Sequence, residues 1–274
     1  MIGFASKEEL PQLMALFSEC FPGEEAFAGW FFQRIWQAQN TLVYRANGEI
    51  EAMLQLLPVT FVQGSRAFGG EYVYAVGTKT TARGKGYAAA LLEAARIETL
   101  KRGKDALILI PAEPSLFDYY ARFGYRAAFY LKETEVSARA QEGLCLAGPE
   151  TFEELGAVYE SCMAGRFHLK RDAAQFEIQA ELFGAENLYL LKEEGRVTAY
   201  GFAEQLGQTW RVAEAIGQNT EALAAAIAAE KGQKAILMRT AASDEKKPFA
   251  MILPLKAEET AGQGLPPYVN LLYN

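Results

Sequence analysis

Glycine and basic residues alternate in the sequence RGKG at residues 83–86, between a predicted strand at 72–78 and a predicted helix at 87–102. Glycine lets the backbone approach a ligand closely, and the first N–H groups of a helix favour negative charge. Arg83 and Lys85 add positive charge to the same turn. These residue types in this order predict a binding site for a phosphate or pyrophosphate group.

The spacing of the glycines separates this turn from two common nucleotide-binding motifs. The GxxxxGK[ST] pattern of a P-loop does not occur here, and the GxGxxG pattern would need glycine where Ala89 stands. We therefore expect neither a P-loop nor a Rossmann dinucleotide turn.

The elements around the turn form one strand–helix–strand unit over residues 70–125. In the predicted helix, Leu91 and Ala95 fall on one apolar side, and Gly103 marks its end. Residues 106–110 are a continuous apolar run with the length of a buried strand. This pattern favours a sheet covered by helices.

Two further segments precede this unit. Residues 40–45 and 50–59 read as strands of a hairpin around Asn47-Gly48. The segment 24–39 reads as a helix rich in aromatic residues. Its aromatic side chains either pack in the core or form a wall of the substrate pocket.

The second half of the chain faintly repeats the first. Short matches, such as residues 76–77 with 216–217, recur in the same order. The stretch 217–232 is eleven residues shorter than its counterpart 77–103, and the missing residues are those of the RGKG turn. The second copy is therefore expected to keep the sheet and to lack the phosphate site.

These patterns predict an α/β fold with two related domains. We expect a mixed, twisted sheet flanked by helices at residues 1–137, a linker at 138–149, and a smaller degenerate repeat at 150–274.

Composition excludes several classes of function. The net charge of −7 and the lack of a basic stripe argue against a nucleic-acid partner. No apolar run has the length of a membrane span, and the first residues do not resemble a signal peptide. The three cysteines form no CxxC pair and there is one histidine, so we expect no metal site and a cytoplasmic protein with reduced thiols.

A family resemblance rests on two motifs. Arg83-x-x-Gly86-x-Ala88 follows the strand, and Tyr120-Ala-Arg-Phe-Gly124-Tyr follows the second strand. Together they resemble the GNAT superfamily of acyl-CoA-dependent N-acetyltransferases, in element order over residues 1–136. The tandem organisation looks most like the Eis-like (enhanced intracellular survival) acetyltransferases, which are usually longer.

The resemblance implies that acetyl-CoA is the cosubstrate. Its pyrophosphate would lie on the turn, its pantetheine arm along the strand, and Tyr120 would protonate the leaving thiolate. Where family members often carry Asn after the second strand this chain has none, and Ser115 is the nearest substitute. The implied binding residues are Val76, Gly77, Thr78, Arg83, Gly84, Lys85, Gly86, Tyr87, Ala88 and Ser115.

The general base has several candidates. A protonated amine must lose a proton before attack, and five acidic residues lie near enough in sequence to accept it. In Eis-like enzymes the terminal carboxylate acts in the site, so Asn274 is a second candidate; alternatively, residues 266–274 form an edge strand. His168 is expected to be a surface or capping residue, or to line the pocket. The five acids are Glu71, which opens the central strand, Glu24, Glu25, Glu113 and Asp118.

We therefore predict an N-acetyltransferase that moves an acetyl group from acetyl-CoA to a primary amine of a small molecule or peptide. The amine would attack directly in a ternary complex, and the second domain would complete or cover the acceptor pocket. The alternative is a non-catalytic acyl-CoA sensor or scaffold.

Overall fold

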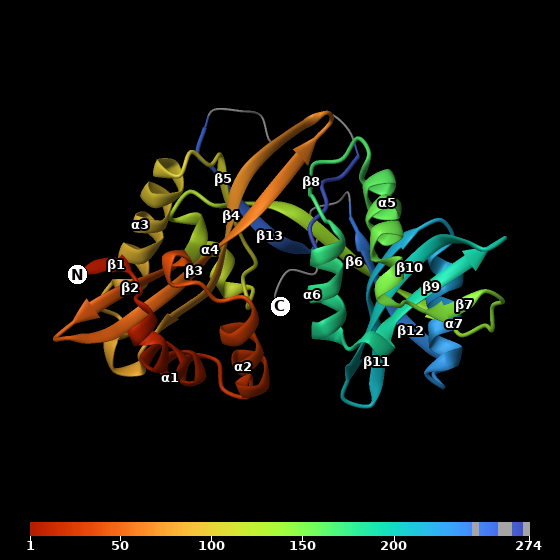
Figure 1. Ribbon diagram of the computed structural model, residues 1–274, viewed down its shortest axis with the longest axis horizontal. Helices are drawn as coiled ribbons and strands as arrows, with labels where there is room; N and C mark the ends of the chain where they lie inside the picture. The colour runs from red at the N-terminus through yellow and green to blue at the C-terminus, as the bar shows by residue number, and fades with distance from the viewer. Residues whose placement is uncertain (243–246, 257–264, 271–274) are drawn as a thin grey trace. The chain divides into compact units, whose positions relative to one another are not determined.

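The computed structural model describes residues 1–242, 247–256 and 265–270 of the chain. The chain forms two compact units, each built from more than one stretch of sequence (Figure 1). Unit 1 comprises Met1–Thr60, Ala67–Ala127 and Ala250–Thr260, and unit 2 comprises Phe61–Arg66, Ala128–Phe249 and Ala261–Asn274. None of the helices in the described ranges has both the length and the apolar character needed to cross a membrane.

The sheet of unit 1 is mixed. Its strands are β1 (Ile2–Phe4), β2 (Thr41–Ala46), β3 (Glu49–Gln63), β4 (Arg66–Thr78), β5 (Ala106–Leu109) and β13 (Pro248–Pro254). They lie in the order β1-β2-β3-β4-β5-β13, with β4 parallel to β5 and β13 antiparallel to β5. The predicted hairpin joins β2 to β3 through Asn47 and Gly48, whose φ angles of 53° and 82° suit a type I′ turn.

Helices cover both faces of this sheet. They are α1 (Leu10–Cys20), α2 (Glu25–Arg34), α3 (Tyr87–Lys101) and α4 (Ser115–Ala121). On one face, Val73 of β4 packs with Leu91 of α3 and with Tyr120 of α4. On the other face, the ring of Phe31 in α2 lies 5.4 Å from that of Tyr74. The first face therefore carries the helices that border the predicted phosphate turn.

The aromatic segment predicted at residues 24–39 forms α2 and the turn after it. Phe31 and Phe32 are buried and pack against Phe17 of α1, which confirms core packing for these two residues. Phe27 and Trp30 are half-buried.

Unit 2 repeats the same plan with a shorter connection between its central strand and the helix that follows it. Its strands are β6 (Arg126–Ser137), β7 (Leu144–Leu146), β8 (His168–Leu169), β9 (Leu188–Glu193), β10 (Arg196–Leu206), β11 (Thr209–Gly217) and β12 (Ala235–Ala241), and its helices are α5 (Phe152–Met163), α6 (Ala173–Phe183) and α7 (Thr220–Glu230). The main sheet has the order β6-β12-β11-β10-β9-β7, with β11 parallel to β12. The predicted α/β fold with a degenerate repeat is confirmed.

Each unit contains one strand that comes from the other half of the sequence. β6 comes from the first half of the sequence and pairs with β12 in unit 2. β13 comes from the second half and pairs with β5 in unit 1. The units therefore do not follow the boundaries expected at residues 137 and 150, because local sequence does not encode which distant strand an edge accepts. The segment expected to be a linker contains β7, which pairs with β9.

Candidate functional site

Strands β4 and β5 separate part of the way along their length. Their parallel pairing runs only from Gly70↔Ala106 to Tyr72↔Ile108. At Ala75 the backbone has φ +49°, a left-handed conformation that non-glycine residues seldom adopt. Beyond this point the β4 backbone has left its pairing with β5.

The irregularity at Ala75 also reverses the faces of β4. Val73 packs on the α3 side of the sheet. Regular alternation would place Gly77 on that side too, yet a Cβ at Gly77 would lie 2.9 Å from Cys20 Sγ of α1. One extra residue is therefore accommodated between them, as in a β-bulge.

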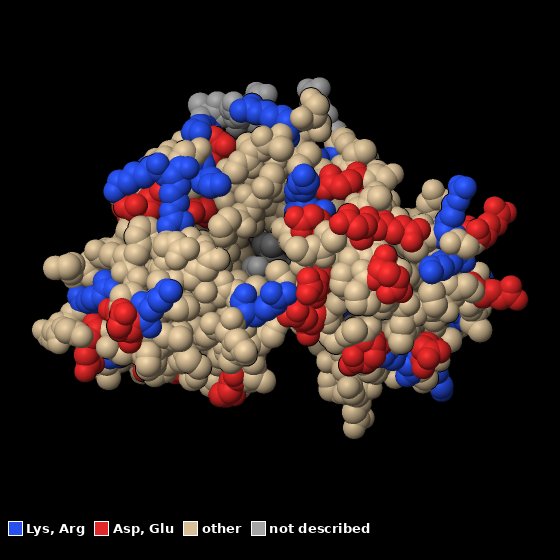
Figure 2. Space-filling view, viewed as in Figure 1, with Lys and Arg blue, Asp and Glu red and all other residues tan. Residues whose placement is uncertain are grey.

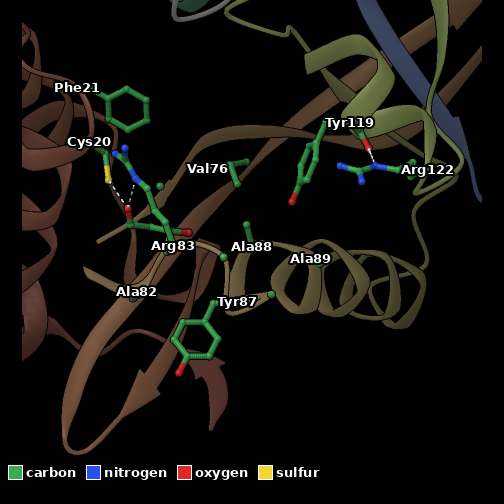
Figure 3. A pocket seen from close by; sticks show the side chains of 14 residues that line it. Cys20, Phe21, Val76, Ala82, Arg83, Tyr87, Ala88, Ala89, Tyr119 and Arg122 are labelled. Carbon is green, nitrogen blue, oxygen red and sulfur yellow. Dashed lines mark hydrogen bonds between the residues drawn. The ribbon is translucent and has the colours of Figure 1, made fainter. Parts of the chain in front are cut away.

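A pocket of about 560 Å³ opens beside the free edge of β4. Figure 3 shows its side chains: Cys20 and Phe21 on one side, Val76 in the middle, and Tyr119 and Arg122 of the α4 region on the other side. All of these residues belong to unit 1. The rest of the lining comes from the backbone of Gly77 and Thr78 and from the predicted turn, with Ala82, Arg83, Gly84, Gly86, Tyr87, Ala88 and Ala89.

The glycines of the turn shape an open cradle at the start of α3. Gly84 and Gly86 have φ angles of +77° and +81°, and a Cβ built on either would meet no atom within 4 Å. Gly86 is the N-cap residue of α3, so no side chain caps the helix, and its first turn contains no acidic residue. The first N–H groups of α3 are thus available to an anion, as the sequence predicted.

The charge of the pocket is positive. Arg83 and Arg122 line it, and none of the described residues that line it carries a carboxylate. Arg83 Nε donates a hydrogen bond to the carbonyl of Thr78 at 3.4 Å, which places the guanidinium next to the free strand edge. Lys85, predicted as a binding residue, is exposed and does not line the pocket.

Two adjacent tyrosines in α4 have different surroundings. Tyr120 is only 8% exposed and packs in the core, and burial raises its pKa to about 12. Tyr119 lines the pocket; burial also raises its pKa, while the charge of Arg122 acts in the opposite direction. The two rings form an edge-to-face pair with centroids 5.3 Å apart.

Comparison with known proteins identifies the unit that carries this pocket. Residues 2–128 match the family model described as acetyltransferase (GNAT) domain. These residues form a GNAT acetyltransferase domain. No curated protein sequence matches the chain significantly.

Solved structures show where this GNAT domain stands within a larger fold. A probable N-acyltransferase from Enterococcus faecalis V583 superposes with a TM-score of 0.77 at 15% identity, covering 93% of this chain and 72% of that one. A GCN5-related N-acetyltransferase from Anabaena variabilis gives 0.75 at 18% identity, with 93% and 73% covered. Eis1 from Mycobacterium abscessus gives 0.67 at 18% identity, with 94% and 74% covered. The likeness extends over both units and supports a tandem GNAT-like fold.

Glu71, the predicted base at the start of the central strand, faces α3 of the GNAT domain. It is 1% exposed, its carboxylate accepts a hydrogen bond from Arg102 Nη1 at 2.6 Å, and Thr99 Oγ1 donates a second one. The carboxylate is thus directed at α3 and its neighbours, and Glu71 does not line the pocket. This geometry argues against Glu71 as the base.

The other sequence candidates are also outside the pocket lining. Ser115 begins α4, is exposed, and donates a hydrogen bond to Glu113 at 3.4 Å. Glu24, Glu25, Glu113 and Asp118 are exposed and none of them lines the pocket of the GNAT domain. Asn274 lies outside the described residues. In the described ranges, no group of three His, Cys, Asp or Glu residues could hold a metal ion.

His168 is buried in unit 2, so the expectation of a surface position was wrong. It is 3% exposed, and its Nδ1 lies 3.0 Å from the carbonyl oxygen of Arg166, two residues earlier in the chain. The ring lies edge-to-face with that of Tyr159, with centroids 5.8 Å apart.

Sequence reasoning missed six pocket residues: Cys20, Phe21, Ala82, Ala89, Tyr119 and Arg122. Tyr119 and Arg122 were within reach, since Tyr119 directly precedes the predicted Tyr120 motif and Arg122 is part of it. Cys20 and Phe21 lie more than fifty residues before the turn, and only the packing of α1 against Gly77 brings them to it.

Proposed function

We propose that this chain is an acyl-CoA-dependent N-acetyltransferase that transfers an acetyl group from acetyl-CoA to a primary amine of a small molecule or peptide. The observation that carries the proposal is the open glycine cradle at the uncapped start of α3, next to the free edge of β4.

The pocket fits the anionic part of CoA. The N–H groups of residues 84–88 and the guanidinium of Arg83 would hold the diphosphate, because uncapped helix N-termini bind phosphate oxygens. The backbone of Val76 and Thr78, freed from β5, would pair with the amide groups of the pantetheine arm. Family membership of the domain implies the same cosubstrate.

The transfer joins the amine nitrogen to the thioester carbon and breaks the carbon–sulfur bond. The N–H groups of the separated β4 edge would stabilise the negative charge that develops on the carbonyl oxygen. Tyr120 would donate its proton to the departing sulfur, because a phenol with a pKa raised to about 12 stays protonated at neutral pH. Among the residues that the structure describes, no carboxylate lines the pocket, and we propose that the amine attacks as its free base. The proton that the nitrogen loses on forming the amide would then return, through solvent, to the phenolate of Tyr120.

The proposed role of Tyr120 as proton donor is the point on which a second candidate function differs. Tyr120 is buried and does not line the described pocket, which favours a second candidate function: an acyl-CoA-binding sensor without turnover. Both candidate functions require that acetyl-CoA binds at the glycine cradle. Only the enzyme also transfers the acetyl group to an amine.

A thiol-release assay with acetyl-CoA and a library of amines tests the two candidates. Release of CoA that depends on one class of amine supports the enzyme. Tight binding of acetyl-CoA with no amine giving release would favour the sensor. The three cysteines are free, and we propose a cytoplasmic setting in which they stay reduced.

A further inference from the structure

We propose that Arg122 recognises the 3′-phosphate of CoA, with Tyr119 holding its guanidinium in position, so that the pocket distinguishes CoA from 3′-dephospho-CoA. This inference rests on the proposed function and adds a second anion site to it.

Arg122 lies at the end of α4, away from the glycine cradle. In the view of Figure 3, Val76, Ala88 and Tyr119 separate Arg122 from Arg83. The pocket therefore carries its two arginines on different walls, one from the turn before α3 and one from the end of α4.

Tyr119 fixes the guanidinium of Arg122 in two ways. The guanidinium carbon lies 4.8 Å from the centroid of the Tyr119 ring, a cation–π distance. Arg122 Nε also donates a hydrogen bond to the carbonyl of Tyr119 at 3.5 Å. These contacts use the Nε–H group and one face of the Arg122 guanidinium. Its terminal Nη–H groups can therefore donate hydrogen bonds to an anion.

The pairing of the arginines in unit 1 supports a ligand role for Arg122. Arg45, Arg96 and Arg102 each form an ion pair with a glutamate of the same unit. Arg122 and Arg83 pair with no carboxylate in the part of the chain that the structure describes. Of these five arginines, the two that line the pocket are the ones without an ion pair to a described carboxylate.

The chemistry of CoA supplies two separate anions for these two cations. Its diphosphate matches the cradle and Arg83. Its 3′-phosphate is carried on the ribose, apart from the diphosphate, and needs a donor of its own. A guanidinium binds phosphate oxygens in a two-pronged geometry that an ammonium does not match.

The test is a titration of the full chain with acetyl-CoA and with 3′-dephospho-acetyl-CoA, without an amine. We expect the unaltered protein to bind acetyl-CoA about tenfold or more tightly than the dephospho compound, the usual gain from a charge-assisted hydrogen bond. In Arg122→Gln the affinity for acetyl-CoA should fall to that for the dephospho compound, whose own affinity stays the same. Arg96→Gln, which removes an exposed arginine outside the pocket, should keep the full preference.

Two variants of Tyr119 separate positioning from binding. Tyr119→Phe keeps the ring under the guanidinium and should keep the preference, whereas Tyr119→Leu should lower it by about threefold.

The outcomes separate this inference from the proposed function. If the unaltered protein binds both compounds equally, or if Arg122→Gln weakens both equally, the 3′-phosphate role is wrong while CoA binding stands. If the unaltered protein binds neither compound, the proposed function itself is wrong and this inference falls with it.

Discussion

The β4–α3 junction of unit 1 and the β11–α7 junction of unit 2 share one plan and differ in what fills them. In both, a strand with a glycine at or next to its end, Gly77 in β4 and Gly217 in β11, leads into a helix that packs back on the sheet. Nine residues connect Gly77 to α3, and they include the glycine cradle. Only two connect Gly217 to α7. The predicted loss of the phosphate turn from the second copy is confirmed.

The helix starts differ in charge as well as in length. α3 begins at Gly86 with no acid in its first turn. α7 begins at Asn219 and carries Glu221 in its first turn, where a carboxylate interacts favourably with the helix dipole. The Asn219 side chain donates a hydrogen bond to Glu193 at 3.1 Å and does not cap the helix. The protein thus supplies its own negative charge at α7 and leaves that place open at α3.

Strands β4 and β11 also differ in the groups that lie beside them. In the repeat alignment Glu214 of β11 stands where Tyr74 stands in β4. Glu214 is fully buried, pairs with Arg171 through an Nη2–Oε2 contact of 3.1 Å, and accepts a hydrogen bond from Tyr268 at 2.7 Å. Asn270 Nδ2 donates to the carbonyl of Ala213 at 2.8 Å. Buried polar groups of the same chain thus lie beside β11, where a pocket lies beside β4. The comparison indicates that the space beside such a strand can hold either a ligand or side chains of the protein.

Breaking the buried pair in unit 2 should have the largest effect. Arg171→Leu leaves the carboxylate of Glu214 buried without its partner, which typically costs about 3–5 kcal/mol of unfolding free energy. Denaturant unfolding measures this loss. The double variant Arg171→Leu, Glu214→Leu removes both charges and should regain much of it. Equal losses in the single and double variants would show that packing, rather than charge, is what Arg171 contributes.

Filling the cradle in unit 1 should abolish cosubstrate binding. Gly86→Glu strains a backbone with φ +81° and adds negative charge where the diphosphate is expected. We expect acetyl-CoA affinity to fall by about a hundredfold or more, measured by calorimetric titration. Asn219→Glu at the equivalent position of unit 2 is the matched control and should leave the affinity unchanged. Binding of two acetyl-CoA molecules per chain would contradict the expectation that only the β4–α3 junction holds the cosubstrate.

Removing the hydroxyl of Tyr120 tests whether the unit 1 site is catalytic. Tyr120→Phe should lower the rate of acetyl transfer by roughly a hundredfold, within the usual contribution of an acid, with acetyl-CoA affinity unchanged. A pKa raised to about 12 keeps the phenol protonated as pH rises, so between pH 6 and 10 the unaltered enzyme should gain activity as the amine loses its proton. A fall in activity near pH 10 that disappears in Tyr120→Phe would mean that the phenol titrates in that range.

Changing the acid at the start of α7 should have the smallest effect. Glu221→Gln removes a charge that interacts favourably with the helix dipole, at a cost of about 0.3–1 kcal/mol. Thermal unfolding at low salt should show this loss, and high salt should reduce it. A gain in stability would mean that the carboxylate is unfavourable at this terminus.

Local features of the fold followed from the sequence, and features that join distant residues did not. The glycine turn, α3 and the Asn47-Gly48 hairpin each depend on neighbouring residues, and the structure has them where expected. The face of Glu71 depended on contacts with α3, thirty residues further on. The pocket wall from Cys20 and Phe21 and the Arg171–Glu214 pair required tertiary packing, which periodicity does not report.

The exchange of β6 and β13 sets an order of events during synthesis. β5 ends at Leu109, but its partner β13 ends at Pro254. During synthesis β13 therefore leaves the ribosome on the order of ten seconds after β5. Throughout that interval the apolar core of unit 1 lacks Met251 and Leu253, which β13 contributes to it. The stretch that matches the family model, residues 2–128, therefore does not include every strand of the sheet to which it belongs.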